Sequence, residues 1–218
     1  NNLMKTILFL KLIFLISIFL FKIFNKKTKE QFNFNNNLII YNNFYEKNTF
    51  NKIKLILEKI ELKYDRRVNS RKTRCLLKKD YEELYNLIYN NNKLKNLIKK
   101  TYKNNYIDNP DFPIEYREYF DGSSGMRWHQ DLSMFSPDCL EAVLTIENNS
   151  DSKFMWDENE EIKSIKPLEN TLVIVKPNTI SHKVSRVNGN RTIIKFILQF
   201  KDSIKKESFH YQIKNCPI

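Results

Sequence analysis

Two histidines and one aspartate have the residue types and the spacing that could hold a single metal ion. His129 and Asp131 are separated by one residue, and His182 stands at the start of a later β-branched run. In extended backbone, residues i and i+2 point to the same side, so His129 and Asp131 could bind one ion together. Two imidazoles and one carboxylate form a facial triad with open coordination positions, which is typical of iron(II) sites that activate oxygen.

A histidine–aspartate–histidine pattern alone is weakly specific, but an arginine nine residues after His182 makes the interpretation more specific. Arg191 follows the turn-forming run Asn188-Gly189-Asn190, where a hairpin would return the chain to the same region. Its planar guanidinium could bind a carboxylate through two parallel charge-assisted hydrogen bonds, a geometry that lysine does not offer. The sequence therefore predicts a metal ion and a carboxylate ligand in one cavity.

The few glycines lie beside these candidate residues. The chain has three, of which Gly122 and Gly125 precede His129, and Gly189 separates His182 from Arg191. In a composition that avoids glycine, such positions indicate a positive φ or a close approach of the backbone.

The elements that must position these residues change in kind along the chain. Helical spacing predicts helices over residues 51–64, after Asp80 as an N-cap, and around Leu94, Leu97 and Ile98. From residue 113, short β-branched and aromatic runs separated by turn signals predict strands over 114–120, 140–146, 171–175, 182–187 and 191–200. Helices followed by strands favour an α+β domain with a jelly-roll or sandwich core.

Residues 119–131 and 182–191 resemble the two halves of the iron(II)- and 2-oxoglutarate-dependent dioxygenases, most closely those of the prolyl hydroxylase type. The resemblance implies a double-stranded β-helix (jelly-roll) barrel, buttressed by N-terminal helices. It implies iron(II) bound by His129, Asp131 and His182. It also implies 2-oxoglutarate as cosubstrate, with its distal carboxylate held by Arg191 and Tyr119, and ascorbate is a candidate further cofactor. The expected reaction hydroxylates a substrate C–H and releases succinate and CO2.

Two positions depart from the family pattern: Met126 replaces a common aromatic, and Ile193 replaces a small polar residue. The segment between the two triad histidines is short and contains no familiar substrate loop. A protein or peptide substrate, hydroxylated at proline or lysine, is the family-based expectation. The alternatives are the same iron chemistry on a nucleic acid or small molecule, a non-catalytic metal-binding barrel, and a zinc hydrolase, which would have no use for Arg191.

Other residues near the motif have both structural and functional interpretations. Tyr119 fits core packing as well as cosubstrate contact, because the chain has 11 tyrosines. Arg127 and Trp128 fit a surface or core position better than the mouth of a substrate site. His210 has no evident partner, and residues 157–161 indicate a solvated acidic loop.

The N-terminal segment is expected to be a membrane anchor. Residues 6–24 are almost wholly apolar, and a bilayer span needs about 20 residues. No small-residue cleavage site follows, so an uncleaved anchor is favoured over a signal peptide and over a buried helix. Lysines at 22, 26, 27 and 29 outnumber Lys5, which predicts a cytosolic domain by the positive-inside rule. The first methionine is Met4, which leaves open that the sequence is a fragment.

The sequence thus divides into an anchor (1–25), an Asn-rich linker (26–50) and an oxygenase domain (51–218). In that domain, residues 51–112 are expected to form a helical support and 113–218 the jelly-roll core. Length limits the chain to one such domain behind its leader.

The net charge and the cysteine content say less about the function than the motif residues do. The formal charge of +12 fits nucleic acid, an anionic membrane or acidic substrates. The basic residues are densest in two stretches: Arg66, Arg67, Arg71, Lys72 and Arg74, and Lys93, Lys95, Lys99, Lys100 and Lys103. No aromatic residues are interleaved with them as in a base-stacking surface, so these stretches are expected to be solvated faces. Three widely spaced cysteines, Cys75, Cys139 and Cys216, indicate neither a disulfide framework nor a zinc ribbon.

Overall fold

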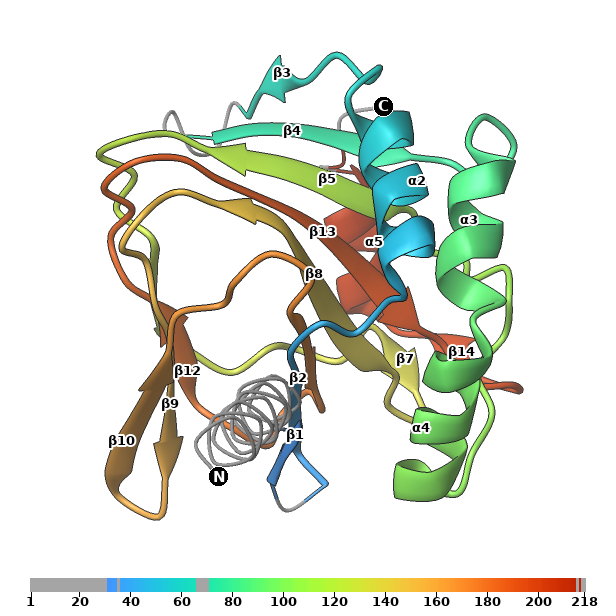
Figure 1. Ribbon diagram of the computed structural model, residues 1–218. Helices are drawn as coiled ribbons and strands as arrows, with labels where there is room; N and C mark the ends of the chain where they lie inside the picture. Colours follow the sequence, from blue (N-terminus) through green and yellow to red (C-terminus); the bar gives the residue numbers. More distant parts are fainter. Residues whose placement is uncertain (1–30, 35, 66–70, 215, 217–218) are drawn as a thin grey trace, which may run out of the picture.

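Two antiparallel sheets form the centre of the computed structural model, which describes residues 31–34, 36–65, 71–214 and 216 (Figure 1). The large sheet has the order β1 (Gln31–Phe34), β2 (Leu38–Tyr41), β11 (Leu172–Val175), β8 (Leu140–Asn148), β13 (Arg191–Leu198), β5 (Ile114–Tyr119), β4 (Arg71–Leu76), β3 (Lys63–Tyr64). The small sheet has the order β10 (Glu161–Ile165), β9 (Phe154–Glu158), β12 (His182–Val184), β6 (Met126–His129). A short pair joins β14 (Ile204–Lys205) to β7 (Phe135–Ser136). The arrangement is of the jelly-roll type.

Strand alternation divides the large sheet into a helix-packed face and a pocket face. In β13, Ile194 and Phe196 belong to the core shared with the helices, whereas Arg191, Ile193 and Lys195 line a pocket. Successive side chains of a strand point to opposite faces, so one eight-residue strand serves both the core and the pocket.

Three helices cover the outer face of the large sheet (Figure 1). They are α2 (Lys47–Leu57), α3 (Glu82–Tyr89) and α4 (Asn92–Tyr102), while α5 (Glu207–Lys214) follows β14. The predicted cap at Asp80 is wrong, since α3 has Tyr81 at its N-cap without a side-chain hydrogen bond. Asn91 does cap α4, accepting a hydrogen bond from the backbone nitrogen of Leu94 at 3.0 Å.

The expected linker carries β2 and β1 in addition to connecting segments. Leu38, Ile39 and Ile40 are each at most 1% exposed, and β2 pairs with both β1 and β11. A short run of apolar residues suffices for a strand that is covered on both faces, so the surrounding asparagines conceal it in the sequence. The barrel therefore begins before the domain boundary that composition suggested.

The expected helical support also contains a strand, β4, and the basic run around it is not wholly solvated. Arg71 is 8% exposed and forms an ion pair with Asp65, and its guanidinium lies 5.9 Å from the ring centre of Tyr119. Residues 66–70, which include Arg66 and Arg67, lie outside the described residues. Arg71 was predicted on a solvated face because sequence does not reveal the carboxylate that neutralises it.

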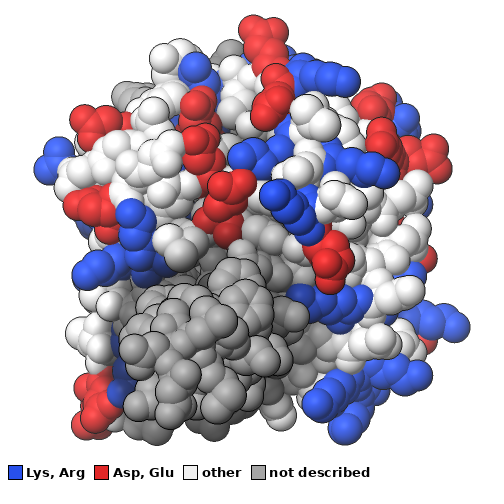
Figure 2. All heavy atoms as spheres, in the orientation of Figure 1, with Lys and Arg blue, Asp and Glu red and all other residues white. Residues whose placement is uncertain are grey.

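Positive and negative side chains are intermixed on one face of the molecule, where Lys and Arg lie among Asp and Glu (Figure 2). Lys54 and Glu169 form an ion pair at 2.9 Å, and Lys95 and Asp108 form one at 3.2 Å. On this face, the distribution favours a solvated surface over a continuous nucleic-acid surface.

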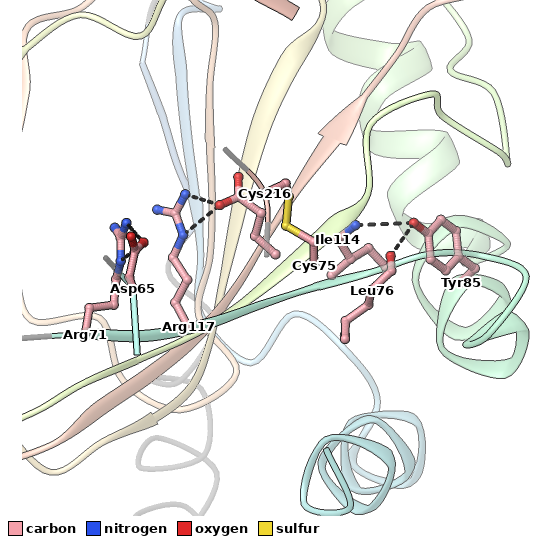
Figure 3. Close-up of a disulfide and its surroundings, with 9 residues drawn as sticks. Asp65, Arg71, Cys75, Leu76, Tyr85, Ile114, Arg117 and Cys216 are labelled. Carbon is pink, nitrogen blue, oxygen red and sulfur yellow. Dashed lines mark hydrogen bonds and ion pairs between the residues drawn. A yellow bond between two sulfur atoms is a disulfide. The ribbon is translucent and has the colours of Figure 1, made fainter. Parts of the chain in front are cut away.

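A disulfide that the sequence did not indicate joins β4 to the segment after α5 (Figure 3). Cys75 is bonded to Cys216 across a sequence separation of 141 residues, while Cys139 is a buried free thiol. On the same strand, the carbonyl of Leu76 accepts a hydrogen bond from the Tyr85 hydroxyl at 2.8 Å, which ties α3 to β4. The pairing escaped prediction because it depends on two segments that meet only in the folded chain.

Replacing both Cys75 and Cys216 with serine is expected to lower the free energy of unfolding by about 4–5 kcal/mol, the chain-entropy value for a loop of more than 100 residues. Denaturation in guanidinium chloride measures this change. Reductant should destabilise the wild type but leave the double variant unaffected. Equal stability of the two proteins under oxidising conditions would contradict the disulfide.

The predicted anchor, residues 1–25, lies outside the described residues. Within the part of the chain that the structure describes, none of the helices has the length and apolar character that a membrane crossing requires.

Candidate metal centre and its pocket

Adjacent strands of the small sheet bring the three predicted metal ligands together. His129 ends β6 and His182 begins β12, and the two residues are direct partners in this antiparallel pair. Asp131 follows β6, with Oδ1 3.5 Å from Nε2 of His129 and Oδ2 3.3 Å from Nε2 of His182. One ligand atom from each of the three residues lies within 4.8 Å of the others. Register, rather than proximity in sequence, therefore assembles the triad.

Backbone carbonyls orient both imidazoles. Nδ1 of His129 lies 2.8 Å from the carbonyl oxygen of Arg127, and Nδ1 of His182 lies 3.2 Å from that of Ile180. Because a carbonyl oxygen only accepts, Nδ1 of each ring donates to it, and Nε2 is the nitrogen that faces Asp131 and is available to a metal ion. Metal-binding histidines are commonly fixed in this way through their second nitrogen.

The electrostatics of the triad favour an ionised carboxylate. Burial raises the pKa of Asp131, but the neighbouring imidazoles of His129 and His182 and the charge of Lys195 outweigh burial and hold the pKa well below its usual range. The carboxylate of Asp131 raises the pKa of His129, against the opposing effects of burial and of Lys195. Asp131 is thus available as an anionic ligand at neutral pH.

The triad fits a divalent metal ion. Nε2 of His129 is buried and has no hydrogen-bond partner of acceptable geometry among the described residues. A buried polar atom without a partner is costly, and a metal ion would satisfy it. Two nitrogens and one oxygen on one side leave the other coordination positions open, as in iron(II) oxygenases.

Gly125 allows the two strands of the metal centre to approach each other. It has φ +73°, and a Cβ built on it would lie 2.3 Å from the carbonyl oxygens of both Val184 and Ser185. Val184 is the last residue of β12, the strand that carries His182, and Ser185 follows it. The sequence prediction of a close approach at this glycine is confirmed.

Gly125→Ala is expected to lower the free energy of unfolding by about 1–3 kcal/mol and to weaken metal binding, because β12 must move away from β6. Gly122→Ala is the matched control, since Gly122 has φ +81° but its added Cβ would lie 3.8 Å from the nearest side-chain atom, Nη2 of Arg186. Denaturation and metal competition measure both effects. Equal losses of stability and metal affinity in the two variants would mean that the losses come from the positive φ alone and not from the close contact between Gly125 and β12.

Arg191 lies at another part of the same pocket, opposite Tyr119 in the pairing of β13 with β5. Arg191 is 4% exposed, and its Nε has no hydrogen-bond partner among the described residues. Burial lowers the pKa of this guanidinium, with an opposing effect from Tyr119. Burial raises the pKa of Tyr119, but the charges of Arg117 and Arg71 outweigh it and lower the pKa. Both predicted carboxylate-binding residues therefore line the pocket that contains the triad.

Arg191 differs from the other largely buried cations around the pocket in its lack of a carboxylate partner among the described residues. Three other cations that are largely buried have carboxylate partners; the pairs are Arg71 with Asp65, Arg117 with Glu115, and Lys195 with Glu141. Among the described residues, no carboxylate lies within ion-pair distance of Arg191. A buried charge without a counter-ion is strongly unfavourable, so this arrangement is suited to an anionic ligand.

The remaining pocket wall is mostly apolar. It includes Met126, Val143, Phe154, Val173, Val175, Val184, Val187 and Ile193. Ile193, a departure from the family pattern, packs with Tyr119 and Val187. The wall can exclude water around a bound ligand.

Sequence reasoning missed three charged residues that line the pocket: Arg117, Glu141 and Lys195. Period-two spacing was the available signal, because Arg117 precedes Tyr119 by two residues and Lys195 follows Arg191 by four. Charged residues in a buried strand interrupt its apolar pattern and thereby indicate a polar interior.

The other residues considered in the sequence lie elsewhere. Trp128 is 39% exposed, with the ammonium of Lys183 5.0 Å from its ring centre, and neither Trp128 nor Arg127 lines the pocket. His210 is exposed in α5. Residues 157–161, expected to be an acidic loop, comprise the end of β9, the turn at residues 159–160 and the start of β10.

No protein-family model matches the chain, and no curated protein sequence matches it. Solved structures do match. An oxidoreductase of the 2OG-Fe(II) oxygenase family from Burkholderia pseudomallei aligns with TM-score 0.61 and 10% identity over 74% of this chain and 83% of that one. A prolyl hydroxylase from Trichoplax adhaerens, in complex with a hypoxia inducible factor peptide fragment, aligns with TM-score 0.58 and 13% identity over 77% and 85%.

A third similar structure is HygX from Streptomyces hygroscopicus, with nickel, 2-oxoglutarate and hygromycin B bound. It aligns with TM-score 0.54 and 9% identity over 80% of this chain and 84% of that one. At these identities the similarity is one of fold. The chain has the fold of the 2-oxoglutarate and iron(II) oxygenases, including that of prolyl hydroxylases.

Proposed function

We propose that this chain is an iron(II)- and 2-oxoglutarate-dependent dioxygenase. The observation that carries the proposal is that one pocket contains both the triad of His129, Asp131 and His182 and a buried Arg191 without a carboxylate partner. The fold shared with 2-oxoglutarate oxygenases supports the same chemistry. A metal site alone would explain the triad but not the arginine.

The charges around the pocket fit a divalent cation and a dianion together. Arg71, Arg117 and Lys195 are each neutralised by a carboxylate, which leaves the positive Arg191 and the negative Asp131 to cancel each other. A divalent metal ion alone would then leave two uncompensated positive charges in a largely apolar cavity. A dicarboxylate such as 2-oxoglutarate restores neutrality, so each component stabilises binding of the other.

The bound iron(II) and 2-oxoglutarate would supply the oxidative chemistry, in which O2, 2-oxoglutarate and a substrate C–H give succinate, CO2 and a C–OH group. The chain itself binds and orients. Nε2 of His129 and of His182, with the carboxylate of Asp131, would hold the metal on one side and leave the other side for reactants. The fork of Arg191 would fix the direction of the dicarboxylate, and Phe154 and its apolar neighbours would exclude water.

Anaerobic addition of iron(II) and 2-oxoglutarate tests the proposal. The expected result is a weak visible charge-transfer band that requires both components, followed by succinate formation when air is admitted. Parallel reactions with and without ascorbate test its proposed role as a further cofactor. Folded protein that gives neither the band nor succinate would refute the oxygenase.

The same experiment separates the competing functions. A non-catalytic metal-binding barrel would bind the metal without forming succinate. A zinc hydrolase would act without 2-oxoglutarate and would be indifferent to the loss of Arg191.

For the substrate we propose a protein or peptide, hydroxylated at a prolyl or lysyl side chain. The prolyl hydroxylase from Trichoplax adhaerens, with its bound peptide, supports this choice. The specific observation for a small-molecule substrate is the similarity to HygX, which is bound to hygromycin B. Reaction with peptide pools and with small molecules, read as the mass increase of one oxygen atom, decides between them; labelling of nucleic acid instead would overturn both.

We also propose that the chain is anchored in a membrane through residues 6–24 and that its domain faces an oxidising compartment. The apolar segment supports the anchor. The disulfide between Cys75 and Cys216 supports the compartment, because cytosolic thiols are kept reduced. This placement is opposite to the one predicted from the flanking lysines, because a disulfide needs an oxidising environment whereas a surplus of lysines only biases the orientation. Protease protection of the domain in sealed membrane vesicles is the expected result.

A further inference from the structure

Lys195 is a pocket-lining cation that the proposed chemistry leaves without a role. It lies on β13, four residues after Arg191, and both side chains point into the pocket. Four residues of strand place their Cα atoms about 13 Å apart, so the two cations approach the pocket from separated positions. The side chain of Lys195 is 18% exposed, which is low for an ammonium group.

The surroundings of Lys195 keep it positively charged. Burial lowers the pKa of its ammonium, but Glu141, Asp131 and Glu115 outweigh burial and hold the pKa well above its usual range. An ammonium has three donors, and among the described residues its one ion pair is with Glu141. Lys195 therefore has capacity for a further acceptor.

Lys195 lies at the metal end of the pocket. Its charge acts on the carboxyl of Asp131 and on the imidazole of His129, and both of these residues line the same cavity. In contrast, Arg191 pairs across the sheet with Tyr119. One strand thus presents a cation near the triad and a second cation toward the opposite part of the pocket.

An ammonium next to a divalent metal ion is repelled unless anionic groups lie close to both. Glu141 provides one such group. A keto acid that chelates a metal through one carboxylate oxygen leaves its second oxygen buried and in need of a donor. Arg117, another pocket-lining cation, is occupied by Glu115 and Tyr119, so Lys195 is the group suited to this oxygen.

We propose that Lys195 is a second carboxylate-binding residue of this pocket, holding the keto-acid end of 2-oxoglutarate beside the metal while Arg191 holds the distal carboxylate. The inference rests on the proposed function. It makes the pocket selective for ligands with an anionic group at both ends, one of them next to the metal. Lys195 would act by direct contact with the cosubstrate, and Glu141 would position its ammonium.

Binding of two keto acids to nickel-loaded protein tests the inference without turnover. 2-Oxoglutarate carries both carboxylates, whereas 2-oxopentanoate has the keto-acid end alone. Lys195→Met is expected to weaken both ligands by a similar factor of about 10- to 100-fold, the effect of losing one charge-assisted hydrogen bond. Arg191→Met is expected to weaken 2-oxoglutarate only. Calorimetric titration measures all four affinities.

Two further variants separate binding from support of the fold. Lys163→Met is the matched control, because Lys163 forms an ion pair with Glu161 outside the pocket, and it should leave both affinities unchanged. Glu141→Gln keeps the ammonium and an amide oxygen that can position it, so it should lose less keto-acid affinity than Lys195→Met, whereas a purely structural pair predicts equal losses in the two variants. If Lys195→Met does not fold, the double variant Glu141→Gln/Lys195→Met removes both buried charges and should show the same loss.

Three outcomes are distinguishable. If the wild type binds both keto acids and Lys195→Met binds 2-oxopentanoate equally well, the inference is overturned and the proposed function stands. If the loss in Lys195→Met appears only with 2-oxoglutarate, Lys195 acts at the distal carboxylate and the inference is again wrong. If the nickel-loaded wild type binds neither keto acid, the proposed function itself fails.

Discussion

Replacing His182 with alanine is expected to abolish succinate formation and to weaken metal binding by more than about 100-fold, since even outer-shell partners of metal ligands are commonly worth 10- to 100-fold. His182 is 6% exposed, and its Nε2 lies 3.3 Å from Asp131. Removing it leaves one nitrogen and one carboxylate, which do not define three adjacent positions around an ion. Titration with a metal-competing dye and a succinate assay measure the two losses.

His210 provides the matched control, because the chain has three histidines and His210 is the one outside the triad. His210→Ala should retain metal affinity and turnover. His182 also contacts the ring of Phe154, with ring centres 5.5 Å apart, so the variant needs a circular dichroism spectrum to confirm its fold. Folded His182→Ala with unchanged metal affinity would rule out this triad.

Replacing Arg191 with methionine is expected to weaken 2-oxoglutarate binding by about 100- to 10,000-fold, the combined effect of two charge-assisted hydrogen bonds. Arg191→Lys should fall between wild type and Arg191→Met, because the charge remains but the planar fork is lost. Calorimetric titration of the nickel-loaded proteins measures the affinities, and metal binding itself should change little.

The same substitution should stabilise the ligand-free protein. Arg191 is buried, and among the described residues no carboxylate lies within ion-pair distance of it, so methionine removes a charge whose lost hydration no direct partner offsets. An increase of about 1–4 kcal/mol in the free energy of unfolding is expected, the range found when buried ion pairs are replaced by apolar residues. Loss of 2-oxoglutarate binding together with a gain in stability is the signature of a residue kept for its ligand. Destabilisation of Arg191→Met would instead indicate a structural role for Arg191.

The structure also explains why the small number of glycines was informative. All three have positive φ, and Gly125 and Gly189 lie where an added Cβ would meet backbone atoms closer than 3 Å. In this composition, a glycine marks a position that other residues do not tolerate. The β6–β12 contact and the turn before Arg191 both depend on such a position.

The sequence by itself determined which side chains could bind a metal and a carboxylate, because this information is local. The spacing of His129 and Asp131 follows from strand geometry, and the β-branched runs around His182 and Arg191 predict the strands that carry them. These predictions needed only the period of a strand and the chemistry of the side chains. The strand pattern left a jelly roll and a sandwich open, the family resemblance favoured the jelly roll, and the two antiparallel sheets agree with it.

Only the tertiary structure decided which charges are neutralised and which are left for a ligand. Lys195 meets Glu141 through the pairing of β13 with β8, and Cys75 meets Cys216 across 141 residues. Such contacts depend on strand register and sheet order, which sum many weak interactions over the whole chain and leave no local pattern. For the same reason, the strands β2 and β4 were concealed by asparagine and arginine. Arg191 was recognisable as a buried cation without a carboxylate partner among the described residues only once its neighbours were in place.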